Sequence, residues 1–150
     1  MQGMTAADLD RFCRTLAREA ADAVVYADPK GVIGFWNKGA ERIFGFSEAE
    51  ALGKTLDIII PENLRARHWT GYAATMESGK TRYGAGDLLA VPALRKDGRR
   101  ISVEFTILLL HDDRGAVSGI AAILRDVTPR FEEMKRLREA VAAQKKGGSA

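Results

Sequence analysis

The chain has 150 residues, of which 46% are hydrophobic and 29% are charged. This composition is that of one globular domain with enough apolar side chains for a core, and it excludes a disordered chain. The net charge is only +3, so nucleic-acid binding is not expected. Cys13 is the only cysteine, which excludes an internal disulfide or a zinc site and favours a reducing, cytoplasmic compartment. No apolar run reaches the roughly 18 residues of a membrane span, so no membrane partner is expected.

The N-terminal segment, residues 1–21, is predicted to form an amphipathic helix. Thr5 and Asp8 make a candidate capping box at its start. Four residues recur at helical spacing and form one stripe: Leu9, Phe12, Cys13 and Leu16. One small domain does not cover such a stripe alone, so we expect this face to lie in a homodimer interface.

A β-hairpin is predicted next. Two short β-branched and aromatic runs, 23–27 and 32–36, flank the turn Asp28-Pro29-Lys30-Gly31. Two short helices should follow the hairpin. Asn37 can cap the first, while Ser47 and Glu50 make a capping box for the second.

A longer helix is predicted over residues 61–78. Pro61 suits its first turn and Gly79 suits its end. On this helix Leu64, His68, Tyr72 (or Gly71) and Thr75 would share one face. The apolar members of that face should point to the sheet, which would place His68 in a pocket between the helix and the sheet.

The second half of the chain changes to the period of strands. Apolar runs at 87–94, 101–109 and 117–124 are separated by turns that contain glycine. In the middle run, Val103, Phe105 and Ile107 alternate with polar residues and should face the core. Leu108 and Leu110 then point the opposite way and require a partner, which we expect to be the N-terminal helix of this chain or of a second chain.

A last helix is predicted over residues 129–146, after the start signal Thr128-Pro129. Met134, Leu137, Val141 and Gln144 follow a 3-4-3 spacing, which extends over only two heptads. Packing of this helix on its own domain and dimerisation through the two terminal helices are both open. Residues 147–150 are expected to be a disordered tail.

These elements predict one α+β domain. Its core, residues 22–128, should be a five-stranded antiparallel sheet with helices on one face, flanked by a helix at each end. No phosphate-binding loop and no joined nucleophile–base set is present in the sequence, so we do not expect an enzyme.

The chain resembles the PAS family of sensor domains over about residues 21–128. The stretch from Gly31 to Ser47, GVIGFWNKGAERIFGFS, is similar to the N-terminal core of that family, and Glu48–Lys54 continues it. Arg95-Lys96-Asp97-Gly98 and the closing Arg125-Asp126-Val127-Thr128 match its second half. The resemblance implies the PAS fold and a module for signal transduction, as in bacterial two-component systems. It also implies that the C-terminal helix leads to an effector domain or partner protein.

The stretch from Pro61 to Tyr72 also resembles the corresponding helix of heme-binding PAS oxygen sensors. By that resemblance His68 is the candidate ligand of heme iron, and the same pocket would use Leu64, Tyr72, Val103, Phe105, Ile107 and Leu124. The chain departs from those sensors between Gly84 and Leu94, where it has neither the distal arginine nor the second methionine ligand. Trp69 beside the histidine is a further difference.

Three interpretations of the pocket therefore stay open. It binds heme through His68, it binds another small ligand, or it holds no cofactor and the chain is a ligand-free PAS interaction and dimerisation module. In the last case Phe105 and Tyr72 would fill the pocket. The sequence does not identify the signal, the effector (a kinase, a cyclase or a transcription factor), or whether the chain is a fragment.

Overall fold

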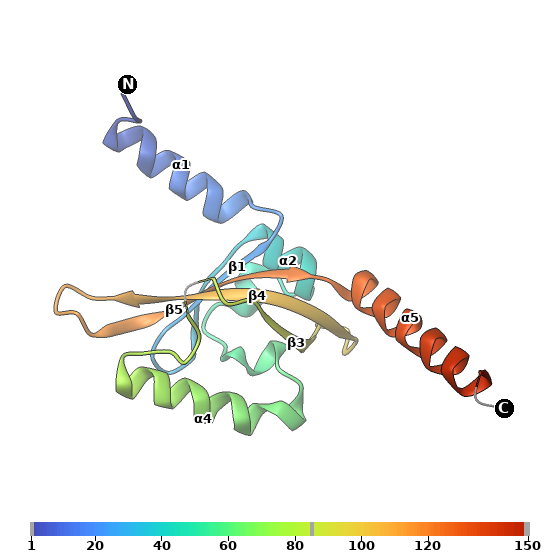
Figure 1. Ribbon diagram of the computed structural model, residues 1–150. Helices are drawn as coiled ribbons and strands as arrows, with labels where there is room; N and C mark the ends of the chain where they lie inside the picture. Colours follow the sequence, from blue (N-terminus) through green and yellow to red (C-terminus); the bar gives the residue numbers. More distant parts are fainter. Residues whose placement is uncertain (1, 85, 149–150) are drawn as a thin grey trace.

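The computed structural model describes residues 2–84 and 86–148. Along this part of the chain a helix, two strands, a group of helices, three strands and a last helix follow one another (Figure 1). The elements are α1 (Ala6–Glu19), β1 (Ala23–Ala27), β2 (Ile33–Trp36), α2 (Lys38–Phe44), α3 (Glu48–Ala51), the 3-10 helix η1 (Leu56–Ile59), α4 (Glu62–Ser78), β3 (Leu89–Leu94), β4 (Arg100–His111), β5 (Val117–Asp126) and α5 (Thr128–Gly147).

The five strands form one antiparallel sheet in the order β2-β1-β5-β4-β3. Strand β5 lies in the centre, between β1 from the first hairpin and β4 from the second half of the chain. This topology confirms the predicted fold class. It also places the start of β1 beside the end of β5, so the roots of the two terminal helices lie close together.

The core lies on one face of the sheet, which we call the inner face. Val25, Val103 and Leu124 project from three strands onto it and pack against Ile43 and Phe44 of α2. The 3-10 helix η1 also packs on this face through Leu56. The predicted inward direction of Val103 is therefore correct, because alternate residues of β4 take opposite sides.

The short helices begin where their capping residues predicted. The Asn37 side chain caps α2, and Gly45 ends it with a φ of +83°. Ser47 and Glu50 form both hydrogen bonds of a capping box at the start of α3. Glycine is required at position 45 because other residues rarely adopt this left-handed conformation.

The two terminal helices project away from the sheet in different directions (Figure 1). Neither α1 nor α5 contains a buried residue. Thr5 caps α1 as predicted, and its hydroxyl donates a hydrogen bond to the Asp8 carboxylate. At the other end α5 extends through Gly147, and Gly148 is its C-cap. Of the predicted tail 147–150, residues 149 and 150 lie outside the described residues.

Candidate functional site

Helix α4 forms one wall of the candidate site. It presents one side to the rest of the domain, with Tyr72 buried and Leu64, His68 and Thr75 half-buried. This is the face that the helical spacing predicted. Gly71, the alternative to Tyr72, is exposed.

Trp69 holds α4 against the first hairpin. Its indole Nε1 donates a 2.7 Å hydrogen bond to the Asp57 carboxylate in η1. Its ring covers Gly31 in the β1–β2 turn, where a Cβ would lie only 2.1 Å from the indole carbons. Gly31 also has a φ of +80°. Glycine is therefore needed here twice, for the backbone conformation and for the close approach of the indole.

Arg65 and Tyr72 add two further ties to the same region. The Arg65 Nε donates to the Ile60 carbonyl at 3.0 Å. The Tyr72 hydroxyl donates to the backbone carbonyl of Asp28 in the β1–β2 turn. Burial of the ring is the main reason that the pKa of Tyr72 is raised far above its usual range. The position of α4 is thus fixed by contacts to η1 and to the hairpin turn.

His68 lies between the two anchoring aromatic rings. Its imidazole packs edge-on against Trp69 at a centroid distance of 4.7 Å and tilted against Tyr72 at 5.7 Å. The Nδ1 atom is buried and has no hydrogen-bond partner. Burial lowers the pKa of His68, and the Asp57 carboxylate opposes this shift only in part. Burial therefore favours the neutral form of the imidazole, which is the form that binds metals.

The apolar side chains predicted for the pocket lie on the inner face of the sheet. Phe105 on β4 pairs across the sheet with Leu124 on β5 and Leu89 on β3, and Ile107 pairs with Ala122. Leu124 is buried, whereas Phe105 and Ile107 are only half-buried. The structure thus brings Val103, Phe105, Ile107 and Leu124 together on one face.

Part of this inner face remains open to solvent beside the edge strand. Val91 of β3 lies opposite the fully buried Val103 of β4, yet 42% of its surface is exposed. Directly opposed residues in a sheet share a face, so this exposure marks where the helices stop covering the strands. The apolar surface near α4 is therefore less completely packed than the core near α2.

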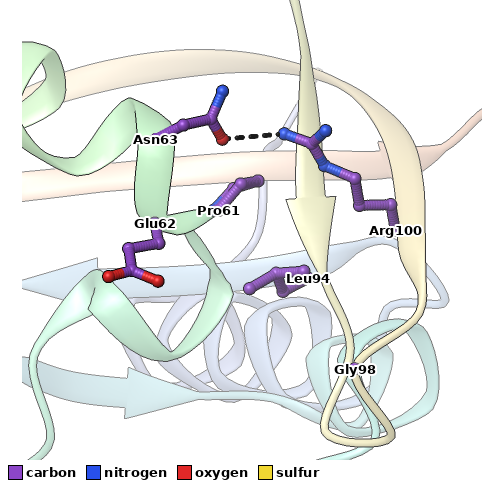
Figure 2. A pocket seen from close by; sticks show the side chains of 6 residues that line it. All are labelled: Pro61, Glu62, Asn63, Leu94, Gly98 and Arg100. Atoms are coloured by element: carbon purple, nitrogen blue, oxygen red, sulfur yellow. Dashed lines mark hydrogen bonds between the residues drawn. The ribbon is translucent and has the colours of Figure 1, made fainter.

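A hollow of about 540 Å³ lies where α4 begins, against the β3–β4 hairpin (Figure 2). The Arg100 guanidinium closes one side of it by donating a 3.0 Å hydrogen bond to Asn63 Oδ1. The full lining is Pro61, Glu62, Asn63, Leu94, Gly98 and Arg100. None of the residues predicted for the cofactor pocket lines this hollow. The hydrogen bond between Arg100 and Asn63 joins residues far apart in the chain, and no local pattern in the sequence predicts it.

Polar contacts join the roots of the two terminal helices. Arg125, near the end of β5, forms a two-pronged ion pair with Asp22, which precedes β1. The Asp126 carboxylate accepts hydrogen bonds from the backbone and hydroxyl of Thr128 at the start of α5. Arg130 in the first turn of α5 forms an ion pair with Glu104 of β4. A displacement of the central strands would therefore move the base of α5.

The outer face of the sheet is apolar and uncovered. Leu108 is 55% exposed, and Leu110 and Ile123 are also exposed. The residues predicted for the dimer interface on α1 (Leu9, Phe12, Cys13 and Leu16) are exposed too, because α1 projects away from its own sheet. In this structure α1 does not cover the outer face of its own chain.

The described residues, 2–84 and 86–148, contain no group of three or more His, Cys, Asp or Glu side chains arranged to hold a metal ion. None of their helices is long and apolar enough to cross a membrane.

Two curated proteins with sensor functions are similar to this chain. The sensor protein FixL of Bradyrhizobium diazoefficiens is 29% identical over 126 residues, which are 84% of this chain and 24% of FixL. The oxygen sensor protein DosP of Escherichia coli is 28% identical over 109 residues, which are 73% of this chain and 13% of DosP. The chain therefore spans a quarter or less of the length of these relatives.

The fold and the family follow from two further comparisons. The crystal structure of the PAS domain of a protein from Colwellia psychrerythraea superposes with a TM-score of 0.67 at 22% identity, covering 81% of this chain and 98% of that one. The sequence profile of the PAS fold matches residues 18–132, well over half of the chain. The strand order of the sheet and the position of the helices on one face agree with that profile, as do the motifs in the sequence. The chain therefore belongs to the PAS family.

Proposed function

We propose that this PAS domain senses a small ligand or the state of a cofactor beside α4 and passes the signal through its terminal helices. Specifically, the cofactor would be heme, held by His68. The observation that carries it is the buried Nδ1 of His68, which has no partner in the protein. A buried polar atom without a hydrogen bond is costly, so its retention points to a ligand. The similarity to heme-binding PAS oxygen sensors and to the oxygen sensor DosP supports the same assignment.

The surroundings of His68 fit a heme group. Histidine is a common axial ligand of heme iron, and it binds the metal in its neutral form. Burial favours that form here. Leu64, Tyr72, Val103, Phe105, Ile107 and Leu124 would supply the apolar environment, and the bound iron would supply a site for a diatomic gas or a redox change.

The protein's own part in signalling lies in how His68 is held. Trp69 and Tyr72 fix the imidazole from two sides and tie α4 to η1 and to the β1–β2 turn. A shift of His68 would therefore be passed to β1 rather than lost in a mobile side chain. From β1 it would reach β5 through the ladder between these strands, and then α5 through Asp126 and Thr128.

Titration of the purified protein with hemin tests this proposal. Binding through His68 should give a sharp Soret band, which His68→Ala should abolish. His111→Ala is the matched control, because His111 is the second histidine of the chain and lies exposed at the end of β4. If the wild-type protein gives only the broad spectrum of free hemin, or if His68→Ala binds equally well, the heme proposal fails.

A second candidate function is that of a ligand-free interaction and dimerisation module. Tyr72 is buried with its hydroxyl bonded, and Phe105 packs against the core, so both occupy space that a ligand would need. The exposed leucines on the outer face and the apolar stripe of α1 favour association. In this case neither hemin nor another small ligand should raise the thermal stability of the chain, while dimerisation should persist.

Both candidates include a homodimer in which α1 of one chain covers the outer face of another. The interface would use Leu9, Phe12, Cys13 and Leu16 against Leu108 and Leu110. We propose a cytoplasmic location and an effector domain or partner protein beyond α5, as the resemblance implies. The chain itself would act without a catalytic site.

A further inference from the structure

The hollow at the start of α4 lies apart from His68 and has the size of a small-molecule site. Its volume of about 540 Å³ falls within the range of known ligand pockets, roughly 300–1,000 Å³. A Cβ at Gly98, in the β3–β4 turn, would meet no atom within 4 Å, so the turn does not fill the hollow. The lining includes none of the residues predicted for the cofactor pocket, so a ligand bound here would be separate from one at His68.

Two side chains of opposite charge flank this hollow without an ion-pair partner. Figure 2 shows Glu62 on one side of it and Arg100 on the other. Within residues 2–84 and 86–148, no basic side chain forms an ion pair with Glu62, and no acidic side chain forms one with Arg100. The two residues do not pair with each other either. A ligand that carries both an ammonium and a carboxylate group would satisfy both charges.

Arg100 is held in a position that suits a carboxylate. Asn63 Oδ1 accepts a 3.0 Å hydrogen bond from the guanidinium, and this bond orients a long side chain at the edge of the hollow. Only one N–H of the guanidinium is used in this way, and its other N–H groups remain for a ligand. Because a planar guanidinium binds a carboxylate through two parallel hydrogen bonds, Arg100 should select a carboxylate over a single neutral oxygen.

An apolar floor, formed by Pro61 and Leu94, lies between the two charges (Figure 2). Leu94 lies directly opposite Arg100 in the β3–β4 ladder, so their side chains are neighbours. The order across the hollow is therefore negative, apolar, positive. A short methylene chain between an ammonium and a carboxylate group matches this order, whereas a dicarboxylate would place a like charge beside Glu62.

We propose that this hollow binds a small zwitterion, an ω-amino carboxylate, between Glu62 and Arg100. The carboxylate pairs with Arg100, the ammonium pairs with Glu62, and the methylene chain lies over the apolar floor. This site goes beyond the function proposed for His68 and does not depend on it. A ligand held by both charged residues ties the start of α4 to the β3–β4 hairpin, and so acts on the helix that carries His68.

Isothermal titration calorimetry of the full chain with ε-aminocaproate tests the site. This probe should bind and saturate at millimolar concentration. Caproate and hexylamine each carry only one of the two charges, and each should bind roughly threefold more weakly or worse. Adipate, which has a second carboxylate in place of the ammonium, should bind more weakly than caproate. No saturable binding of ε-aminocaproate, or equal affinity for caproate, would refute the zwitterion site.

Neutral substitutions identify the residues that hold the probe. Arg100→Gln should weaken the binding of ε-aminocaproate roughly tenfold, because the paired hydrogen bonds to the carboxylate are lost. Glu62→Gln should weaken it roughly threefold, as for one exposed charge pair. Arg99→Gln and Glu77→Gln are the matched controls, because both side chains are exposed and neither lines the hollow. Equal losses in the site variants and the controls would refute the inference.

A charge reversal tests the direction in which the ligand lies. Glu62→Lys should reverse the preference, so that adipate binds more tightly than ε-aminocaproate. An unchanged preference in this variant, with its fold verified by circular dichroism, would refute the pairing of the ammonium with Glu62. His68→Ala separates this site from the predicted cofactor pocket and should still bind ε-aminocaproate. Loss of the probe in His68→Ala would place the ligand in that pocket and overturn the inference, whatever the result with hemin.

Discussion

Asn37 is the buried polar residue on which the junction between α1 and the sheet depends. Its side-chain oxygen accepts hydrogen bonds from the backbone N–H of Val24 at 2.8 Å and of Ala40 at 2.9 Å. Its amide donates to the carbonyls of Asp22 and Ala20, at 3.0 and 3.3 Å. Only 3% of the residue is exposed, so water cannot replace these partners without a local rearrangement.

We predict that Asn37→Ala lowers the free energy of unfolding by about 2–4 kcal/mol. Loss of the N-cap contact to Ala40 contributes about 1 kcal/mol. An unpaired N–H at Val24 contributes roughly 1–3 kcal/mol more. This is a large part of the total stability of a typical domain, about 5–15 kcal/mol.

Urea unfolding followed by circular dichroism measures this change. Asn63→Ala is the matched control, because Asn63 lies exposed in the first turn of α4, where its side chain accepts a hydrogen bond from Arg100. The control should change stability by less than about 0.5 kcal/mol, as surface substitutions usually do. A loss below about 1 kcal/mol for Asn37→Ala, or equal losses in the two variants, would refute the reasoning.

Three further perturbations test other parts of the structure. Gly31→Ala should cost about 2 kcal/mol or more in urea unfolding and shift the Trp69 fluorescence, because the residue has a left-handed backbone and its Cβ would meet the indole. Leu108→Glu should weaken dimerisation at least roughly tenfold by light scattering, with little change in unfolding, since the side chain is 55% exposed; Leu52→Glu is its control on another exposed surface. The Arg125 hydrogen bond holds the pKa of Asp22 below its ordinary value of 3.8. The stabilisation by this ion pair should therefore be complete above pH 3.8 and be lost as the pH falls through the lower pKa of Asp22 in the folded state. Asp22→Asn should accordingly be less stable than wild type near neutral pH, and this difference should disappear in acid.

Much of the fold could be predicted because its signals are local. A capping residue needs only the next three residues, so Asn37 and the Ser47–Glu50 box marked the starts of α2 and α3 correctly. The alternation along β4 likewise showed that Val103 faces the core. Glycine after an apolar helix gave the end of α4 at Gly79, whose φ is +70°.

The candidate site could be predicted only in part because its anchors are long-range contacts. Helical spacing placed His68 and Tyr72 on the inner side of α4, but it could not show that Trp69 reaches Asp57 and covers Gly31. In the sequence Trp69 is only a difference from the heme-binding PAS sensors, whereas in the structure it fixes the position of α4. The Arg100–Asn63 hydrogen bond could not be predicted either, because nothing in the sequence indicates that these two exposed polar residues pair.

The arrangement of contacts explains how one small domain could join its two ends. Asp22 follows α1 and pairs with Arg125, which lies at the end of the strand that leads into α5. Asn37 fixes the same junction from the side of α2. α1 ends and α5 begins beside this junction, so a change in it would reach both helices. A signal that alters the twist of β1 and β5 would therefore act on the directions of both terminal helices.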